Sequence, residues 1–451
     1  MGKLFGTDGV RGTANTELSA LLALKIGSAS AYVLRKKHEG AKMLIGRDPR
    51  ISGDILESAM AAGICSLGVD VYLTGVVPTP AVAFLTQHIQ ADAGIVISAS
   101  HNQMQDNGMK FFGSDGYKLS DEIEAEIEDQ VDGFDAIPRP EGAGVGRMYR
   151  AQDLVEDYLE HLRRMFSYSL DGMKIALDCA NGAVYELAPR LFCELGARPI
   201  VINDQPDGIN INLNCGSLYP AAVQGLVQEN DAHLGLAFDG DGDRAILVDE
   251  KGRLVNGDHV LAMCALSLAR QSRLPGNAIV STVMSNIGLE ITLARNDISL
   301  VRTQVGDRYV SDEMRRTGIT LGGEKSGHVI FAEHATTGDG VVTALQVLTI
   351  MCETGKPLSE LADQMEEFPQ LLINVPVRDK DGWDRVPEII SAIKAGEERL
   401  AGRGRVFVRA SGTEKLIRVM AEGPDMSELE EITQEICAAV EGALGTSEFA
   451  A

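Results

Sequence analysis

Short apolar segments alternate with helical patterns through most of this chain. The segments read as strands include 174–177, 234–238 and 278–282. Stretches in which apolar residues recur at helical spacing follow or precede them, at 154–166, 259–270 and 341–353. Strands that alternate with helices are typical of parallel sheets joined by crossover helices. The chain up to about residue 368 is therefore predicted to form α/β domains.

The pattern changes from about residue 369. Strand-like segments and helices then follow one another at 372–377, 386–394, 405–409 and 416–421, before a terminal helix. This order predicts a smaller α+β domain with an antiparallel sheet. A glycine-rich passage at 142–146 marks an earlier boundary. We therefore expect four domains, at 1–150, 151–254, 255–368 and 369–451.

The composition fits a soluble protein of several domains. The chain has 451 residues, which exceeds what a single core usually supports, and 45% of them are hydrophobic. A formal net charge of −24 disfavours nucleic acid and anionic membranes as partners, because the summed field repels them. No apolar run approaches the length of a membrane span, and the N-terminus lacks a signal-peptide core. These features predict a cytoplasmic protein with no nucleic-acid or membrane partner.

Three carboxylates in five residues stand out, Asp239, Asp241 and Asp243, with glycine between them and Arg244 behind. Like charges this close are tolerable only if a cation lies among them or one carboxyl stays protonated. Oxygen ligands favour a hard divalent ion, magnesium before calcium. Apolar segments at 234–238 and 245–248 flank the loop. The sequence therefore predicts a metal site at the ends of two strands.

Two other interpretations of the acidic loop were weighed. An EF-hand would use Glu250, twelfth from Asp239, but Arg244 stands where that loop needs glycine, and a strand follows, so this interpretation is rejected. A phosphatase that forms an aspartyl phosphate also places an aspartate pair after an apolar strand, with Asp239 as nucleophile. That hypothesis stays open as a remote alternative.

The segment 94–102 is an apolar strand that runs into a polar loop containing Ser98, Ser100 and His101, and Lys110 follows. A serine hydroxyl at a strand end can act as a nucleophile when a base or nearby charge assists it. The alternative is an ordinary turn that closes the strand. The segment alone does not decide between these two interpretations.

Three further glycine-containing loops carry polar side chains. The loop 409–414 combines an arginine, two hydroxyls and a glycine, which suits a phosphate dianion. The loop 322–328 offers a carboxylate, an amine, a hydroxyl and an imidazole, which suits sugar hydroxyls. The loop 6–12 carries Arg11. Because several of these loops follow predicted strands, we expect several domains to share one cleft.

The four motifs together resemble the α-D-phosphohexomutase superfamily over the whole chain. They are ISASHN with Ser100, DGDGDR at 239–244, GGEKSGH at 322–328 and RASGTE at 409–414, in the family's order. FGTDGVRG near the N-terminus and the segments 305–310 and 336–340 resemble its glucosamine branch. The resemblance implies three related mixed α/β domains and a smaller C-terminal α+β domain around a central cleft.

The resemblance implies an isomerase that interconverts glucosamine 6-phosphate and glucosamine 1-phosphate through phosphorylated Ser100. Glucosamine 1,6-bisphosphate would be the intermediate and activator, and the product would supply UDP-N-acetylglucosamine for peptidoglycan synthesis. One Mg²⁺ per chain is implied, held by Asp239, Asp241, Asp243 and a phosphate oxygen on Ser100. Closure of the C-terminal domain is expected, because an exposed phosphoserine would be lost to water.

The resemblance also assigns roles to single residues. Lys110 and His328 are candidates for proton transfer, and charge stabilisation is an equal alternative for Lys110, because an ammonium acts as a base only when its pKa is depressed. The implied catalytic set is Ser100, His101, Lys110, Arg11, Arg244 and His328. The implied substrate-binding set is Glu324, Ser326, Arg409, Ser411, Gly412, Thr413 and Arg418.

The chain departs from the family pattern beside these motifs. Gln103 and Lys415 stand where the family usually has proline, and Ala410 replaces a larger residue. Loss of proline is expected to loosen the loops, because proline pre-sets φ, but it removes no catalytic group.

The sequence leaves several points open. A phosphomannomutase or phosphoglucomutase of the same superfamily is the alternative, since one or two pocket residues decide recognition at carbon 2. A metal-stabilised protein without enzymatic activity is a remote alternative. The residues do not fix the oligomeric state, for which a homodimer is one expectation.

Overall fold

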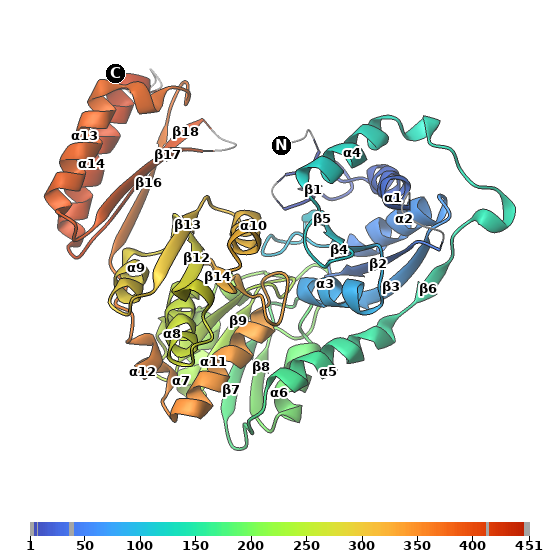
Figure 1. Ribbon diagram of the computed structural model, residues 1–451, viewed down its shortest axis with the longest axis horizontal. Coiled ribbons are helices and arrows are strands. Elements are labelled where there is room, and N and C mark those ends of the chain that lie inside the picture. The colour runs from blue at the N-terminus through green and yellow to red at the C-terminus, as the bar shows by residue number, and fades with distance from the viewer. Residues whose placement is uncertain (1–3, 7, 36–39, 412–414, 446–451) are drawn as a thin grey trace. The chain divides into compact units, whose positions relative to one another are not determined.

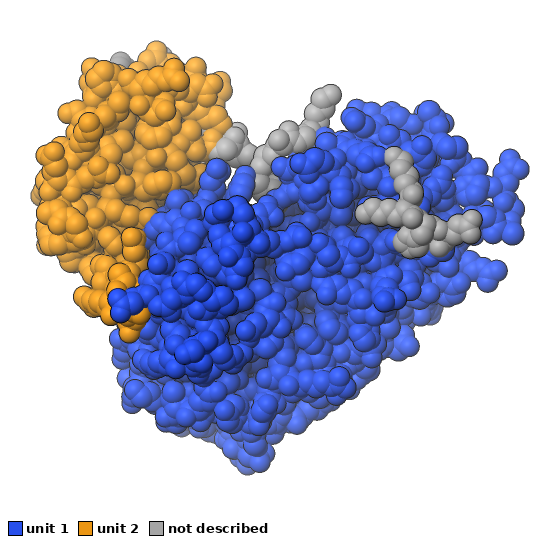
Figure 2. Space-filling view, viewed as in Figure 1, with its two compact units in different colours: residues 1–284, 297–364 blue, residues 285–296, 365–451 orange. Residues whose placement is uncertain are grey.

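The computed structural model describes residues 4–6, 8–35, 40–411 and 415–445. The chain divides into two compact units, the first made of residues 1–284 and 297–364 and the second of residues 285–296 and 365–451 (Figure 2). Three sheets lie in the first unit and one in the second. The predicted boundaries between four domains remain predictions, whereas the predicted three mixed sheets and one antiparallel sheet are confirmed.

The first sheet has six strands in the order β1-β5-β4-β2-β3-β6 (Figure 1). The strands are β1 (Val10–Thr13), β2 (Lys42–Arg47), β3 (Asp70–Val76), β4 (Ala93–Ile97), β5 (Asp106–Gly113) and β6 (Met148–Arg150). The helices are α1 (Ala20–Leu34), α2 (Gly53–Cys65), α3 (Thr79–His88) and α4 (Asp121–Asp132). Strands β4 and β5 run antiparallel, while β2 is parallel to β3 and β4. The sheet is therefore mixed.

The second sheet has the order β11-β10-β9-β7-β8. Its strands are β7 (Lys174–Asp178), β8 (Arg198–Ile202), β9 (Leu234–Phe238), β10 (Ala245–Asp249) and β11 (Leu254–Val255). The helices of this part are α5 (Val155–Met165), α6 (Leu187–Glu194) and α7 (Ala221–Asn230). Every residue of β9 and β10 is buried, which explains why both read as unbroken apolar segments in the sequence.

The third sheet has the order β13-β12-β14-β15. Its strands are β12 (Ala278–Thr282), β13 (Ser299–Thr303), β14 (Leu321–Gly323) and β15 (Val329–Phe331). The helices of this part within the first unit are α8 (Gly257–Arg270), α10 (Asp307–Thr317), α11 (Gly340–Thr354) and α12 (Leu358–Ala362). Buried Asp339 caps the N-terminus of α11 by accepting hydrogen bonds from the N–H groups of Val341 and Val342, at 2.9 and 3.0 Å.

Each of these three sheets contains a strand that turns back into an antiparallel neighbour, and the connecting loop carries a motif. The pairs are β4 with β5, β9 with β10 and β14 with β15. Their loops contain Ser100, the acidic loop and the GGEKSGH motif, respectively. Three motifs far apart in the sequence therefore occupy the same topological position in three related sheets.

The second unit holds a three-stranded antiparallel sheet in the order β16-β18-β17. Its elements are α9 (Ile287–Ala294), β16 (Gln370–Pro376), α13 (Pro387–Leu400), β17 (Arg405–Ala410), β18 (Leu416–Glu422) and α14 (Met426–Leu444). Its core includes Val375, Ile417 and Ile432. No helix in the described ranges is both long and apolar enough to cross a membrane.

Candidate active site

The loop after β4 places Ser100 in an unusual backbone conformation. Its φ is 51°, in the left-handed region that serine rarely adopts, and its side chain is 1% exposed. The Ser100 N–H donates to the Ser98 hydroxyl at 2.9 Å, and Ser98 in turn donates to Asp48 at 2.6 Å. Strain of this kind persists only where the surroundings hold it in place.

Arg50 supplies most of that support. It is fully buried, and its Nε donates to Asp48 at 2.8 Å. Its two terminal nitrogens donate to four backbone carbonyls of the serine loop, those of Ser100, Asn102, Gln103 and Asp106. The Arg50 guanidinium therefore holds four positions of the loop backbone at once. It also holds the carbonyl of Gln103, the residue at which the missing proline is predicted to loosen the loop.

Asn212 holds the same loop from another part of the chain. Its amide donates to the carbonyls of Ser100 and Asn102, each at 2.9 Å. Asn212 lies between β8 and β9, so a loop of the second sheet is hydrogen-bonded to the serine loop of the first sheet. The sequence alone indicated neither Arg50 nor Asn212. The available signal was an arginine shortly after β2, at a strand end where functional loops gather.

The serine hydroxyl and the acidic loop meet directly. Ser100 Oγ donates to Asp239 Oδ2 at 2.6 Å, across 139 residues of sequence. One side-chain oxygen from each of Asp239, Asp241 and Asp243 lies within 4.8 Å of the others, and all three residues are buried. The predicted catalytic serine and the predicted metal ligands are therefore brought together.

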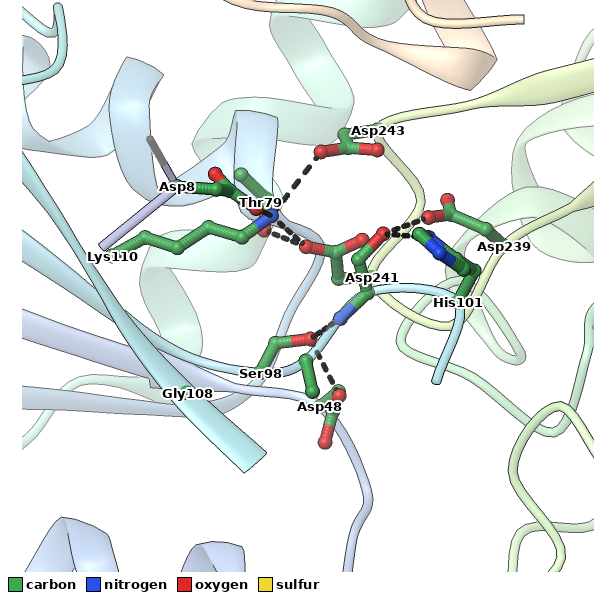
Figure 3. Close-up of polar contacts among 12 residues, drawn as sticks. Asp8, Asp48, Thr79, Ser98, His101, Gly108, Lys110, Asp239, Asp241 and Asp243 are labelled. Atoms are coloured by element: carbon green, nitrogen blue, oxygen red, sulfur yellow. Dashed lines mark hydrogen bonds and ion pairs between the residues drawn. The ribbon is translucent and has the colours of Figure 1, made fainter. Parts of the chain in front are cut away.

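Lys110 balances part of this negative charge. Its ammonium points at the acidic loop (Figure 3), 2.8 Å from Asp241 and 3.3 Å from Asp243. Thr79 also donates to Asp241, at 2.6 Å. Asp241 Oδ1 and Asp243 Oδ1 are nevertheless buried without a hydrogen-bond partner among the described residues. Two such carboxylate oxygens beside a third carboxylate fit a hard divalent cation, so the residues suit the predicted metal.

The pKa shifts show how strongly these groups interact. Burial, followed by the charges of Asp243 and Asp241, raises the pKa of Asp239 well above its ordinary value. Burial alone would raise the pKa of Asp243, but Lys110 and His328 hold it well below. The clustered carboxylates therefore make ionisation of Asp239 unfavourable unless a cation lies beside it.

The environment of Lys110 does not favour proton abstraction. Burial alone would lower the pKa of Lys110, but Asp241 and Asp8 hold it well above the ordinary value. The ammonium form is therefore stabilised in the arrangement described. Of the two roles predicted for Lys110, this geometry favours charge stabilisation over action as a base.

The two predicted histidines lie in different environments. His101 Nδ1 is 3.4 Å from Ser100 Oγ, and burial, followed by the nearby Arg244, lowers the pKa of His101 to about 4. His101 is therefore neutral at pH 7. His328 Nε2 accepts the Gly338 N–H at 3.1 Å, so its other nitrogen faces Asp243 at 3.6 Å. His328 thus points at the acidic loop.

A cavity of about 440 Å³ opens beside these groups and is lined by residues of the predicted site. Asp243, Arg244, His101, Arg11 and Glu324 all lie along it. Burial alone would lower the pKa of Arg244, but Asp243 and Asp239 raise it. Arg11 forms an ion pair with Asp8, which the sequence did not single out. The first unit therefore contains a cavity that unites three of the predicted motifs.

The sugar motif is positioned by its own turn. Glu324 Oε1 accepts the N–H of Gly306 at 3.1 Å, which ties the motif to the loop before α10. The backbone N–H of Glu324 also donates to the His328 carbonyl at 2.9 Å. Ser326 lies between them and is exposed. Both predicted hydroxyl-binding residues thus belong to one turn between β14 and β15.

The predicted phosphate residues lie in the second unit. Arg409 and Arg418 are paired across the antiparallel strands β17 and β18. Burial, followed by the charge of Arg418, lowers the pKa of Arg409. Two adjacent guanidinium groups that repel each other form a suitable binding site for an anion. Ser411 is buried, and Lys380, which the sequence did not indicate, donates to its carbonyl at 2.7 Å. Gly412 and Thr413 lie outside the described residues.

Comparisons with known proteins identify the family of this chain. Four successive segments match the domain profiles of phosphoglucomutase/phosphomannomutase: alpha/beta/alpha domain I at residues 2–136, domain II at 156–252, domain III at 256–368 and the C-terminal domain at 372–439. A curated relative, the phosphoglucosamine mutase of Desulforamulus reducens, is 53% identical over 437 residues, covering 97% of this chain and 98% of that protein.

Solved structures show the same fold. A phosphoglucomutase/phosphomannomutase family protein from Burkholderia thailandensis has a TM-score of 0.81 at 24% identity, covering 98% of this chain and 99% of that one. Aspergillus fumigatus N-acetylphosphoglucosamine mutase, in complex with GlcNAc-6P and magnesium, has a TM-score of 0.68 at 18% identity, covering 98% and 96%. At these identities the likeness supports the fold alone.

The chain therefore belongs to the phosphoglucomutase/phosphomannomutase family, whose members are α-D-phosphohexomutases. Within that family it groups with the phosphoglucosamine mutases.

The acidic loop predicts a measurable metal affinity. Asp243→Asn should weaken Mg²⁺ binding by at least about 10-fold in calorimetric titration, because the substitution removes one of the three carboxylates. Asp249→Asn is the matched control, since Asp249 is a buried carboxylate at the end of β10 that accepts hydrogen bonds from Lys251 and Arg253. Equal affinities in the two variants would contradict the assignment of Asp243.

The contribution of the Asn212 side chain to stability can be measured by comparing it with a second asparagine. Asn212 and Asn214 both have left-handed backbones, with φ of 56° and 54°, but Asn214 is exposed. Asn212→Ala should therefore lose about 1–3 kcal/mol more unfolding free energy than Asn214→Ala, since two buried hydrogen bonds are lost, although both carbonyls keep their bonds from Arg50. The shifts of the urea transition give the comparison, and equal losses would show that Asn212 does not hold the loop.

Proposed function

We propose that this protein is a phosphoglucosamine mutase, an isomerase that interconverts glucosamine 6-phosphate and glucosamine 1-phosphate. The observation that carries the proposal is the contact of Ser100 Oγ with Asp239 at 2.6 Å, inside a buried acidic loop. Family membership and the 53% identical relative support the same reaction.

Ser100 is proposed as the phosphoryl carrier. Its phosphoryl group would pass to the 1-hydroxyl of glucosamine 6-phosphate, breaking the bond to Ser100 Oγ and forming glucosamine 1,6-bisphosphate. After the intermediate turns over in the cleft, Ser100 takes the 6-phosphoryl group back and leaves glucosamine 1-phosphate. Burial of the serine in the first unit limits loss of the phosphoryl group to water.

One Mg²⁺ is proposed at Asp239, Asp241 and Asp243, with a phosphate oxygen on Ser100 as a further ligand. The two buried carboxylate oxygens without hydrogen bonds support this proposal, and so does the magnesium bound by the A. fumigatus enzyme. The ion would neutralise charge on the transferring phosphoryl group. Lys110 and Arg244 of the chain itself would stabilise the remaining charge.

The sugar and its distant phosphate are proposed to bind on different loops. Glu324 and Ser326 would contact hydroxyls, while Arg409, Ser411 and Arg418, with Gly412 and Thr413, would hold the phosphate that is not reacting. GlcNAc-6P bound to the A. fumigatus enzyme supports a phosphosugar as substrate. Because different loops bind the sugar hydroxyls and the distant phosphate, the pocket accepts both orientations of the bisphosphate.

For proton transfer, the chemistry favours a neutral side chain near the reacting oxygen. His101 meets that condition, because its lowered pKa leaves it neutral and Nδ1 is 3.4 Å from Ser100 Oγ. Lys110 is held as an ammonium, and His328 is directed at Asp243. We therefore propose that neutral His101, rather than Lys110, exchanges a proton with Ser100 Oγ, and that Lys110 stabilises charge.

Homodimer formation and cytoplasmic location remain predictions from the sequence.

Replacement of the carrier tests the mechanism. Ser100→Ala should abolish mutase turnover, because no oxygen remains to accept the phosphoryl group. Ser58→Ala on the exposed side of α2 should keep wild-type turnover. Intact-mass and peptide analysis of the wild type should locate an acid-stable phosphate on Ser100. An acid-labile phosphate on Asp239, or turnover by Ser100→Ala, would replace this mechanism with the aspartyl-phosphate alternative.

The sugar is tested by comparing kcat/KM for glucosamine 6-phosphate, glucose 6-phosphate and mannose 6-phosphate. We expect glucosamine 6-phosphate to be preferred by about 10- to 200-fold, the range that one substituent supplies in a binding pocket. Preference for either neutral sugar would instead identify a phosphoglucomutase or phosphomannomutase. If no sugar phosphate is turned over while Mg²⁺ raises the Tm, the protein would be the metal-stabilised non-enzyme.

A further inference from the structure

Lys118 lies between two carboxylates from parts of the chain that contain different sheets. Its ammonium is 2.6 Å from Asp8 Oδ1, beside β1, and 2.6 Å from Asp307 Oδ2, at the first residue of α10. All three side chains are largely shielded from solvent. Because both oxygens are bound to one nitrogen, the two carboxylates are held close together, and the ammonium between them offsets part of their repulsion.

Asp8 links Lys118 to two cations of the cavity. While Oδ1 accepts from Lys118, Oδ2 forms an ion pair with Arg11 and lies 3.4 Å from Lys110. Burial alone would raise the pKa of Asp8, but Lys110 and Lys118 hold it well below its ordinary value. The position of Arg11 and of the Lys110 ammonium therefore depends on where Asp8 is held.

Asp307 links Lys118 to the sugar motif. Its carboxylate is 3.9 Å from His328 Nε2. The preceding residue, Gly306, donates its N–H to Glu324 at 3.1 Å and has a φ of 135°, a backbone that favours glycine. A displacement of Asp307 would thus move Gly306 and its contact with Glu324, and would change the charge beside His328.

Contacts beside Lys118 hold the same junction. Arg308 donates to Glu124 at 2.9 Å and to the Leu119 carbonyl at 2.7 Å, and Thr336 donates to the Gly116 carbonyl at 2.6 Å. An exposed ion pair between Arg315 and Asp115, at 3.2 Å, lies further out. The segment 115–124 of the first sheet's domain is therefore fixed to the region around α10 at several points.

We propose that Lys118, together with Asp8 and Asp307, positions the two sides of the cleft, setting the Arg11 loop against the Glu324 and His328 loop. Lys118 does not line the cavity that holds Arg11 and Glu324, so it acts through Asp8 and Asp307. This role rests on the proposed function, because its readout is mutase turnover. Loss of the ammonium would break the direct link between Asp8 and Asp307 and leave their mutual repulsion less well offset, which would separate the loops.

Lys118→Met should lower kcat by about 10- to 100-fold well below its Tm, since small misplacements of catalytic groups cost that much. Lys118→Arg should recover part of the loss, because it restores a cation between the carboxylates. Arg315→Met is the matched control, because it breaks the exposed pair joining the same two regions and should leave kcat unchanged.

A double variant separates positioning from general destabilisation. Asp307→Asn in the Lys118→Met background removes the repulsion, so the double variant should turn over faster than Lys118→Met alone. Wild-type kcat in Lys118→Met, or a lowered Tm with unchanged kcat, would overturn the proposal. If Lys118→Met does not fold, the proposal is tested with Lys118→Arg and with the double variant. An equal loss of kcat in these two variants would overturn the proposal. Absence of turnover in the wild type would instead contradict the proposed function.

Discussion

Three buried carboxylates within 4.8 Å of one another are the constraint on which the site depends. Their repulsion must be offset, and the chain does so in part with the Lys110 ammonium, while the pKa of Asp239 stays well above its ordinary value and two carboxylate oxygens lack hydrogen bonds from the described residues. The Ser100 hydroxyl lies against the same charge. A phosphate on that serine would add further negative charge, so carrier and metal are coupled by electrostatics.

The reactive groups are brought together by one structural feature that is repeated in three sheets. Three sheets each turn one strand back into an antiparallel neighbour, and the turn carries the serine, the acidic or the sugar motif. Contacts such as that of Asn212 with the serine loop and that of Lys118 with Asp307 cross between these sheets. A site assembled from equivalent turns is thus fixed by side chains outside the motifs.

Apolar periodicity predicted α/β domains with parallel sheets and an antiparallel C-terminal sheet, and the spacing of Asp239, Asp241 and Asp243 is an equally local signal, whereas the mixed sheets followed only from the resemblance to the family. Sequence patterns did not indicate Arg50, whose partners lie about fifty residues away, or Lys118, whose partner Asp307 lies 189 residues away. Such contacts depend on tertiary structure. The protonation of Lys110 was equally beyond a local pattern, since it depends on Asp8 and Asp241.

Arg50 contacts the serine loop directly through four backbone carbonyls, and it also donates to Asp48, which accepts a hydrogen bond from Ser98. Every residue type provides a carbonyl, so the loop's shape does not require particular side chains at the gripped positions. Gln103 illustrates this freedom, since it stands where relatives of the superfamily have proline. A side-chain change at Gln103 therefore leaves the Arg50 bond to its carbonyl in place, whereas a change at Ser98 removes a side-chain contact on which the conformation of Ser100 depends.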